Sequence, residues 1–265
     1  IANLFFAGQI NGTTGYEEAA GQGLVAGINA HQNVHGGKPF TMARNESYIG
    51  VLIDDLVNKG VDEPYRMFTS RAEHRILLRQ DHADTRLTER AYQLGLADSY
   101  RYQLYTEKHA AIAMLTDYLQ TNSVKPAVVN AYLESVGATP LQQTTKLLDL
   151  VLRPQVNLVD LANIVPDLQE KIACIKRARE EVVESTEINI KYEGYIRREQ
   201  LSAEKLQRLD RITIPASFDY NTLQSLSTEA RQKLSRIRPA TIGEASSIPG
   251  VSPNDISVLL VLMGR

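Results

Sequence analysis

The first part of the chain places an apolar run, a glycine-rich turn and a small-residue helix one after another within residues 3–23. Residues 4–7 predict a buried strand, and the glycines that follow predict a tight turn into a helix rich in Gly and Ala. This order presents backbone N–H groups, at the positive end of a helix, to an anionic or electron-rich group. A single strand needs neighbouring strands, and the remaining sequence offers none. We therefore expect the chain to be the back part of a larger cofactor-binding protein.

Composition limits the kinds of protein that the chain can be. Its 265 residues suffice for one large domain or two ordinary ones, and a net charge of -2 gives no overall positive field for a nucleic acid. The single cysteine, Cys174, excludes an internal disulfide and a cysteine metal cluster, and favours a reducing cytoplasm. The apolar run 258–263 is far shorter than the roughly 20 residues of a membrane span. The lack of an initiating Met and the start inside a strand suggest a fragment.

Helix signals dominate after the opening turn. We expect helices over residues 21–30, 47–58, 70–79, 88–95, 100–119, 125–137, 144–152, 157–164, 167–209 and 228–237, and two more after the capping boxes at 241–244 and 252–255. Residues 188–192 also alternate like a strand, but the density of charged residues around them favours a helix.

The predicted fold class is therefore mainly α. A short strand–turn–helix, the remnant of a Rossmann-type domain, occupies residues 1–43. A helical domain follows over residues 44–212. A small helical subdomain, set off by a proline-containing linker, occupies residues 213–265.

The opening turn is the first candidate site. Gly8 and Gly12 allow close approach of the backbone, and Gln9 offers an amide at the end of the strand. Gly15 and Tyr16 present N–H groups where the helix begins. The alternative interpretation is a structural crossover that serves packing alone.

A group of arginines is the second candidate site: Arg66, Arg71, Arg75 and Arg79. The last three recur every four residues, so they would share one face of a helix that starts at the capping box of Ser70 and Glu73. Guanidinium groups beside Tyr65 and Phe68 suit a sugar–phosphate backbone and unstacked bases. The alternative is ordinary ion pairing with the nearby carboxylates of Glu63, Glu73, Asp81 and Asp84.

Other signals are weaker. His31 and His35 lie four residues apart but have no third ligand nearby, so a metal site is not expected, and we identify no catalytic nucleophile. The turn at residues 248–251 faintly resembles a helix–hairpin–helix, although a tight packing corner explains it better. An apolar face of the last predicted helix could be covered by a partner, and its candidate residues are Ile256, Leu259, Leu260 and Met263.

Several motifs together resemble one family. The stretch 5–20, which reads FFAGQINGTTGYEEAA, closely resembles the signature of the glucose-inhibited division protein A (GidA, or MnmG) family. Further matching segments are residues 48–56, 64–88, 191–196 and 238–256. The resemblance covers the length of the chain and is very specific.

The resemblance implies a function for the whole protein. A family member binds FAD on a Rossmann-type domain and uses NADH as reductant. With a GTPase partner and a methylene-tetrahydrofolate donor, it adds an aminomethyl-type group to C5 of the wobble uridine of a tRNA. The resemblance further implies a cytoplasmic homodimer. Because most of the flavin domain is missing here, we expect this chain alone to be inactive and not to retain FAD.

Residue roles follow from the same resemblance. Gln9 would contact the flavin, with Gly8, Gly15 and Tyr16 beside it. Arg66 and Arg75 stand at positions that resemble tRNA contacts, with Arg71 and Arg79 in the same row. The tail from about residue 223 would engage the GTPase. His74 stands where relatives often carry Tyr, which leaves the arginine pattern intact. The alternative of a different class is a self-contained helical adaptor or nucleic-acid-binding module without catalysis.

Overall fold

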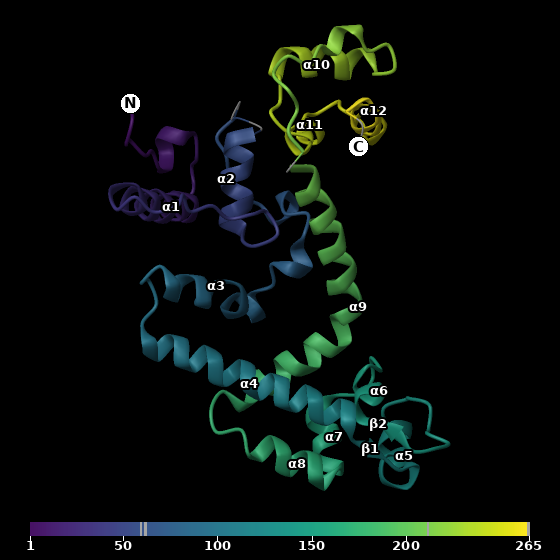
Figure 1. Ribbon diagram of the computed structural model, residues 1–265. Coiled ribbons are helices and arrows are strands. Elements are labelled where there is room, and N and C mark those ends of the chain that lie inside the picture. Colours follow the sequence, from purple (N-terminus) through teal and green to yellow (C-terminus); the bar gives the residue numbers. More distant parts are fainter. Residues whose placement is uncertain (59, 61–62, 211, 264–265) are drawn as a thin grey trace. The chain divides into compact units, whose positions relative to one another are not determined.

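The computed structural model describes residues 1–58, 60, 63–210 and 212–263. The chain divides into two compact units, a terminal unit of residues 1–78 and 198–265 and a middle unit of residues 79–197. Helices dominate both units (Figure 1), and within the described residues the only sheet has two short strands. This confirms the predicted fold class, mainly α. No helix in the described part of the chain is both long and apolar enough to cross a membrane.

The terminal unit begins with an extended segment, not a paired strand. Residues 4–7 form no strand, and the side chain of Phe6 is 54% exposed, so the predicted buried strand is wrong for this chain. The physical reason is that the described residues supply no neighbouring strand to satisfy the backbone groups of this segment. A 3-10 turn η1 (Gly8–Asn11) and helix α1 (Tyr16–Val34) follow.

Helix α2 (Tyr48–Asn58) matches its prediction closely. The Ser47 hydroxyl accepts a hydrogen bond from the Gly50 N–H at 2.8 Å and so caps the helix. Gly60 adopts φ +69°, the left-handed conformation expected just after a helix. Buried Val51 of α2 packs with Ala72 and Leu78 in a small core.

The helix predicted over residues 70–79 does not form. In its place the chain makes separate 3-10 turns: η2 (Thr69–Arg71), η3 (Arg75–Leu77) and η4 (Gln80–His82). The reason is a competing bond to Glu73, which was expected to complete a capping box with Ser70. Arg44 binds the Glu73 carboxylate through two hydrogen bonds of 2.8 Å each and donates to the Arg71 carbonyl at 3.1 Å. The arginines therefore share no helix face.

The middle unit is a helical domain with its own apolar core. Its further elements are α3 (Ala83–Gln93), α4 (Ser99–Thr121), β1 (Ser123–Val124), α5 (Pro126–Ser135), β2 (Thr145–Lys146), α6 (Leu147–Val151), α7 (Leu158–Ile164) and α8 (Pro166–Ala173). The strands β1 and β2 pair antiparallel, with Ser123 opposite Lys146. The core includes Leu115, Leu119, Leu133, Leu150 and Leu161, all fully buried.

Three boundaries in the middle unit differ from prediction. Helix α3 begins at Ala83, five residues before the predicted start at residue 88. Residues 144–152 begin with strand β2 before α6, and the helix predicted over residues 167–209 is divided into α8 and α9 (Arg179–Asp210). Ala178, at φ +49°, interrupts the helix between them. The Arg179 guanidinium then donates to the carbonyls of Ala173 at 2.9 Å and Ile175 at 3.1 Å, which satisfies carbonyls at the end of α8. Residues 188–192 are helical, as the charge density favoured.

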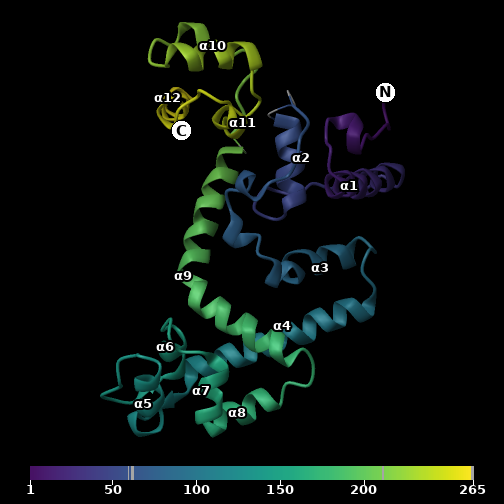
Figure 2. The ribbon, with the colours of Figure 1, turned by 180° about the vertical axis from the view of Figure 1, so that it is seen from behind.

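The C-terminal part of the terminal unit contains η5 (Tyr220–Thr222), α10 (Thr228–Ile237), α11 (Ile242–Ser247) and α12 (Pro253–Leu262). The last three helices form one group in both views (Figure 1, Figure 2). Each begins at a side-chain cap, from Ser227, Thr241 and Ser252 respectively, and Asp255 completes the capping box of α12.

The apolar side chains predicted to form a docking face pack against the core of this small subdomain instead. Ile256 is 7% exposed and Leu259 is fully buried, and Leu260 and Met263 pack against the same core. The expectation that Ile256, Leu259 and Leu260 form an open docking face therefore does not fit the structure. The reason is that a subdomain of three short helices needs these residues to build its own interior.

Two helical glycines should respond oppositely to alanine. A Cβ at Gly50 would overlap the carbonyl oxygen of Ala43 and lie 2.9 Å from that of Met42, whereas a Cβ at Gly194 in α9 has nothing within 4 Å. We expect Gly50→Ala to lower the free energy of unfolding by about 2 kcal/mol, because backbone cannot move aside. Gly194→Ala should raise it by about 0.5–1 kcal/mol through helix propensity. Urea unfolding followed by circular dichroism measures both, and a stabilising Gly50→Ala would contradict the packing.

Acid should weaken the small subdomain through Asp255. Burial alone would raise its pKa, but hydrogen bonds from the Ser252 hydroxyl and from the N–H groups of Ser227 and Ser252 outweigh burial and lower the pKa. The stabilisation is therefore complete above the ordinary Asp pKa of about 4 and is lost as the pH falls through the lower folded value. Asp255→Asn should cost about 2 kcal/mol at neutral pH and remove this acid dependence. Hydrogen exchange of the α10 and α12 amides against pH tests this, and an unchanged pH profile in the variant would count against it.

Candidate functional site

The glycine turn, residues 8–16, is shaped by a buried glutamine that the sequence did not single out. Gln22 of α1 accepts hydrogen bonds at Oε1 from the Gly8 N–H at 3.0 Å and from the Asn11 amide at 2.7 Å. Its own amide donates to the Thr13 hydroxyl at 3.0 Å. Gly8 adopts φ +82°, which explains why glycine stands there. The Gly8 N–H is thus already used inside the protein.

The N-terminus of α1 is open. The N-cap residue, Gly15, provides no side-chain hydrogen bond, so the first N–H groups of the helix lack the usual cap. Tyr16 is 94% exposed, and Gln9 is also exposed. These groups can face an acceptor atom.

Glu18 in the first turn of α1 is buried, with only 5% of its surface exposed. Its Oε1 accepts a hydrogen bond from the Met67 N–H at 2.7 Å. Its Oε2 is buried and has no hydrogen-bond partner among the described residues. A Cβ at Gly15 would overlap Oε2, so this conformation of Glu18 requires a glycine at residue 15.

The glycine turn pairs directly with the arginine segment, residues 64–75. The Tyr65 N–H donates to the Gly12 carbonyl at 2.7 Å, and the Thr14 N–H donates to the Tyr65 carbonyl at 3.2 Å. Thr13 and Tyr65 thereby form an isolated parallel bridge. The Tyr65 side chain is buried, and its hydroxyl donates to Asp55 at 2.8 Å. Burial and this bond to Asp55 raise the pKa of Tyr65, which keeps the hydroxyl protonated.

Three of the four candidate arginines belong to the terminal unit. The Arg71 guanidinium lies 4.5 Å from the centre of the Tyr65 ring, and its Nε donates to the Arg66 carbonyl at 3.0 Å. Arg66, Arg71 and Arg75 are all exposed, and none has a carboxylate partner among the described residues. Their charge is thus available to a ligand.

The ion-pairing alternative holds for the fourth arginine. Arg79 belongs to the middle unit and pairs with Asp81 at 3.0 Å. The other carboxylates that were candidates for pairing are largely engaged elsewhere, since Glu73 binds Arg44 and Asp84 binds Lys108 at 3.0 Å. Arg79 is therefore the weakest of the four candidates.

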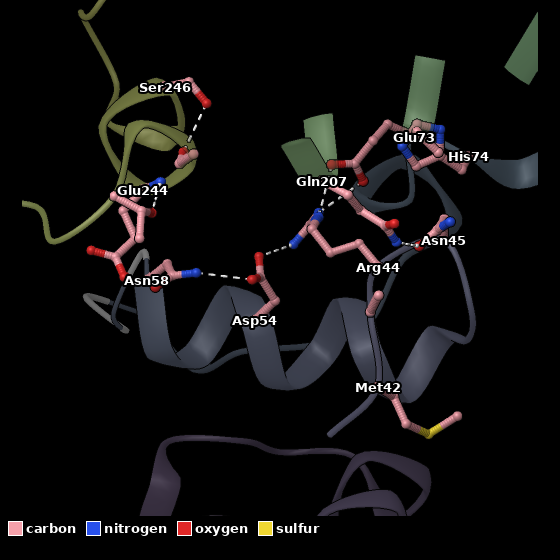
Figure 3. A pocket seen from close by; sticks show the side chains of 14 residues that line it. Met42, Arg44, Asn45, Asp54, Asn58, Glu73, His74, Gln207, Glu244 and Ser246 are labelled. Atoms are coloured by element: carbon pink, nitrogen blue, oxygen red, sulfur yellow. Dashed lines mark hydrogen bonds and ion pairs between the residues drawn. The ribbon is translucent and has the colours of Figure 1, made fainter. Parts of the chain in front are cut away.

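Arg44, which the sequence did not point to, holds this region together. Its guanidinium bonds to Asp54 at 2.7 Å and to Glu73 at 2.8 Å (Figure 3). It also bonds to Asp55 at 2.7 Å. Burial alone would lower the pKa of Arg44, but the three carboxylates outweigh burial and raise it. No local motif predicts this residue, because its partners lie 10, 11 and 29 positions away.

A cavity of about 580 Å³ opens beside Arg44 in the terminal unit (Figure 3). Its polar side chains largely bind one another: Arg44 binds Asp54 and Glu73, and Asn45 binds Gln207 at 3.0 Å. The carboxylate of Glu244 also lines it. Because carboxylates outnumber the one guanidinium, this cavity disfavours a phosphate group.

The histidines give no metal centre. His31 and His35 stack with ring centres 4.2 Å apart near the end of α1, and His35 Nδ1 contacts the His31 carbonyl at 2.9 Å. Within the described ranges, no group of three or more His, Cys, Asp or Glu residues is placed to hold a metal ion. His74, which had no assigned partner in the sequence, is buried and bonds to Glu199 at 2.7 Å.

Family models that match this chain all describe the same family, and together they cover most of its residues. Residues 1–38 match the model described as glucose inhibited division protein A. Residues 99–200 match the tRNA modifying enzyme MnmG/GidA C-terminal helical domain, and residues 202–265 match its C-terminal helical bundle.

Individual relatives agree with the family models. The chain is 62% identical over 266 residues to the tRNA uridine 5-carboxymethylaminomethyl modification enzyme MnmG of Parabacteroides distasonis, and 61% identical to that of Bacteroides fragilis. In both cases the match covers all of this chain but only 43% of the relative. A crystal structure of Aquifex aeolicus GidA superposes with a TM-score of 0.74 at 40% identity, covering all of this chain and 41% of that one. The chain therefore belongs to the MnmG/GidA family and corresponds to its C-terminal region.

Proposed function

We propose that this chain is the C-terminal part of an enzyme that modifies the wobble uridine of tRNA at C5, and that this part binds the tRNA. The relatives are named as tRNA uridine 5-carboxymethylaminomethyl modification enzymes. The observation that carries the proposal is a set of exposed arginines, Arg66, Arg71 and Arg75, in a chain whose net charge is -2. None of the three has a carboxylate partner among the residues that the structure describes. A protein of this charge that binds RNA must concentrate positive charge locally.

The arginine segment suits RNA in a second way. Phe68 lies between the arginines in sequence and is 56% exposed. Exposed aromatic rings beside guanidinium groups stack on unpaired bases, while the guanidinium groups bind phosphates. This combination supports contact with a single-stranded loop of the tRNA.

The glycine turn would contribute to a FAD site in the whole protein. The uncapped N-terminus of α1 and the exposed amide of Gln9 fit an electron-rich group. Tyr16 lies beside them, at the first position of α1. When bound, FAD supplies the redox chemistry, which these side chains do not carry themselves. NADH as reductant and methylene-tetrahydrofolate as carbon donor complete the proposed reaction and rest on the family resemblance alone.

The small subdomain is the proposed docking region for the GTPase partner. Since Ile256 and Leu259 are buried, the apolar surface of α12 consists of Val261, 73% exposed, and Leu262, 50% exposed. Homodimer formation and a cytoplasmic location belong to the same proposal, which follows from the family resemblance and from tRNA as the substrate. The side chains of Leu4, Phe5 and Phe6 are apolar and exposed. Such a patch favours the interpretation that the chain is part of a larger enzyme over that of a self-contained adaptor, in which nothing would cover it.

Replacing Arg75 tests the tRNA interface. In a full-length protein that contains this chain, Arg75→Ala should weaken tRNA binding about three- to tenfold and reduce the slope of log K against log salt by about one. The physical reason is the loss of one phosphate contact and the counterions that it releases. Fluorescence anisotropy with labelled tRNA at several salt concentrations measures both quantities.

Arg177→Ala is the matched control. Its side chain is 53% exposed and pairs weakly with Glu107 at 3.6 Å, so the same charge is removed at another exposed position. It should change affinity by less than twofold. Equal effects of the two variants would indicate a nonspecific charge effect, and unchanged affinity and slope in Arg75→Ala would contradict the proposed interface.

A further inference from the structure

The glycine turn and the arginine segment share their hydrogen bonds. Tyr65 exchanges backbone bonds with Gly12 and Thr14 at 2.7 and 3.2 Å, and two residues later the Met67 N–H donates to Glu18 at 2.7 Å. Both elements belong to the terminal unit. The arginine segment is therefore attached to the turn at residue 65 and to the first turn of α1 at residue 67.

The same residues determine where the arginines lie. The ring of Tyr65 supports the Arg71 guanidinium at 4.5 Å, and Arg71 bonds to the carbonyl of Arg66 at 3.0 Å. A movement of Tyr65 or Met67 relative to α1 would thus change the positions of two candidate RNA contacts. Arg71 and Arg66 therefore depend on the turn through Tyr65.

The turn also has groups whose bonding is incomplete. Oε2 of Glu18 is buried without a hydrogen-bond partner, and the first N–H groups of α1 have no side-chain cap. Buried polar groups without partners are costly, so a ligand that donates a hydrogen bond to Glu18 Oε2 or accepts one from the first N–H groups of α1 would stabilise this region. Ordering the turn also orders Tyr65 and Met67 through the shared bonds. A second ligand that binds at the arginine segment then loses less conformational entropy on binding.

From this arrangement we infer that Glu18 is a positioning residue that couples cofactor binding at the glycine turn to RNA binding at the arginine segment. The inference rests on the proposed function, since it takes FAD and tRNA as the two ligands. Coupling of this kind is reciprocal: FAD should raise the affinity for tRNA by the same factor by which tRNA raises the affinity for FAD.

The experiment measures this factor in a full-length protein that contains this chain, stripped of FAD and then titrated with it. The dissociation constant of labelled tRNA is determined by anisotropy with and without FAD, and that of FAD by flavin fluorescence with and without tRNA. In the wild type we expect a factor of about five or more, equal in both directions. In Glu18→Ala the factor should fall to below two, although both ligands still bind.

Two variants separate positioning from general structure. Glu18→Gln keeps an oxygen that can accept from the Met67 N–H, so it should restore most of the coupling factor. Glu17→Ala removes a carboxylate from the adjacent, exposed position in the same helical turn and should leave the factor unchanged. If the role of Glu18 is purely structural, Glu18→Ala should weaken the binding of both FAD and tRNA but leave the coupling factor unchanged.

Several outcomes would overturn the inference. A wild-type factor of one does so without any variant, even if Glu18→Ala fails to fold. A factor in Glu18→Ala equal to that of the wild type also does so, because the coupling would then run elsewhere. If the wild type binds FAD and tRNA independently, only this inference fails, whereas failure to bind either ligand overturns the proposed function as well.

Discussion

The backbone pairing of Tyr65 with Gly12 and Thr14 is the contact on which the candidate site depends. It is a single parallel bridge, yet it joins residues more than 50 positions apart. Tyr65 is 4% exposed, and its hydroxyl and both of its backbone groups have hydrogen-bond partners. Displacing Tyr65 from this position would leave several polar groups unsatisfied, at a cost of about 1–3 kcal/mol each. The glycine turn and the arginine segment are consequently one structural element made from two parts of the sequence.

Arg44 extends this element to helix α2. Asp55, which is 1% exposed, accepts from both Tyr65 and Arg44 and so connects the two. Removing one partner of such a buried pair leaves an uncompensated charge, which costs about 3–5 kcal/mol. The bonds of Arg44 to Glu73 and to the Arg71 carbonyl explain why residues 69–77 form short turns, and why Arg66, Arg71 and Arg75 remain exposed without lying on one helix.

Features with local causes could be predicted from the sequence. The caps at Thr241 and Ser252, the proline at the start of α5 and the glycine after α2 all act within a few residues, and the helices there lie within two residues of their expected bounds. The predictions failed where a distant partner decided the outcome. Glu73 was taken for a cap, but its partner is 29 residues away. Gln22 and Glu18 resembled ordinary helix residues, because their roles depend on the folded turn.

Hydrogen exchange at the Tyr65 and Met67 amides tests the central claim, that the turn and the arginine segment behave as one element. Both N–H groups donate to the turn and its helix, to Gly12 and Glu18 respectively. In a full-length protein that contains this chain, adding FAD should slow exchange at these two amides together with those of residues 8–16. Slower exchange within residues 8–16 alone, with no change at Tyr65 and Met67, would contradict the account.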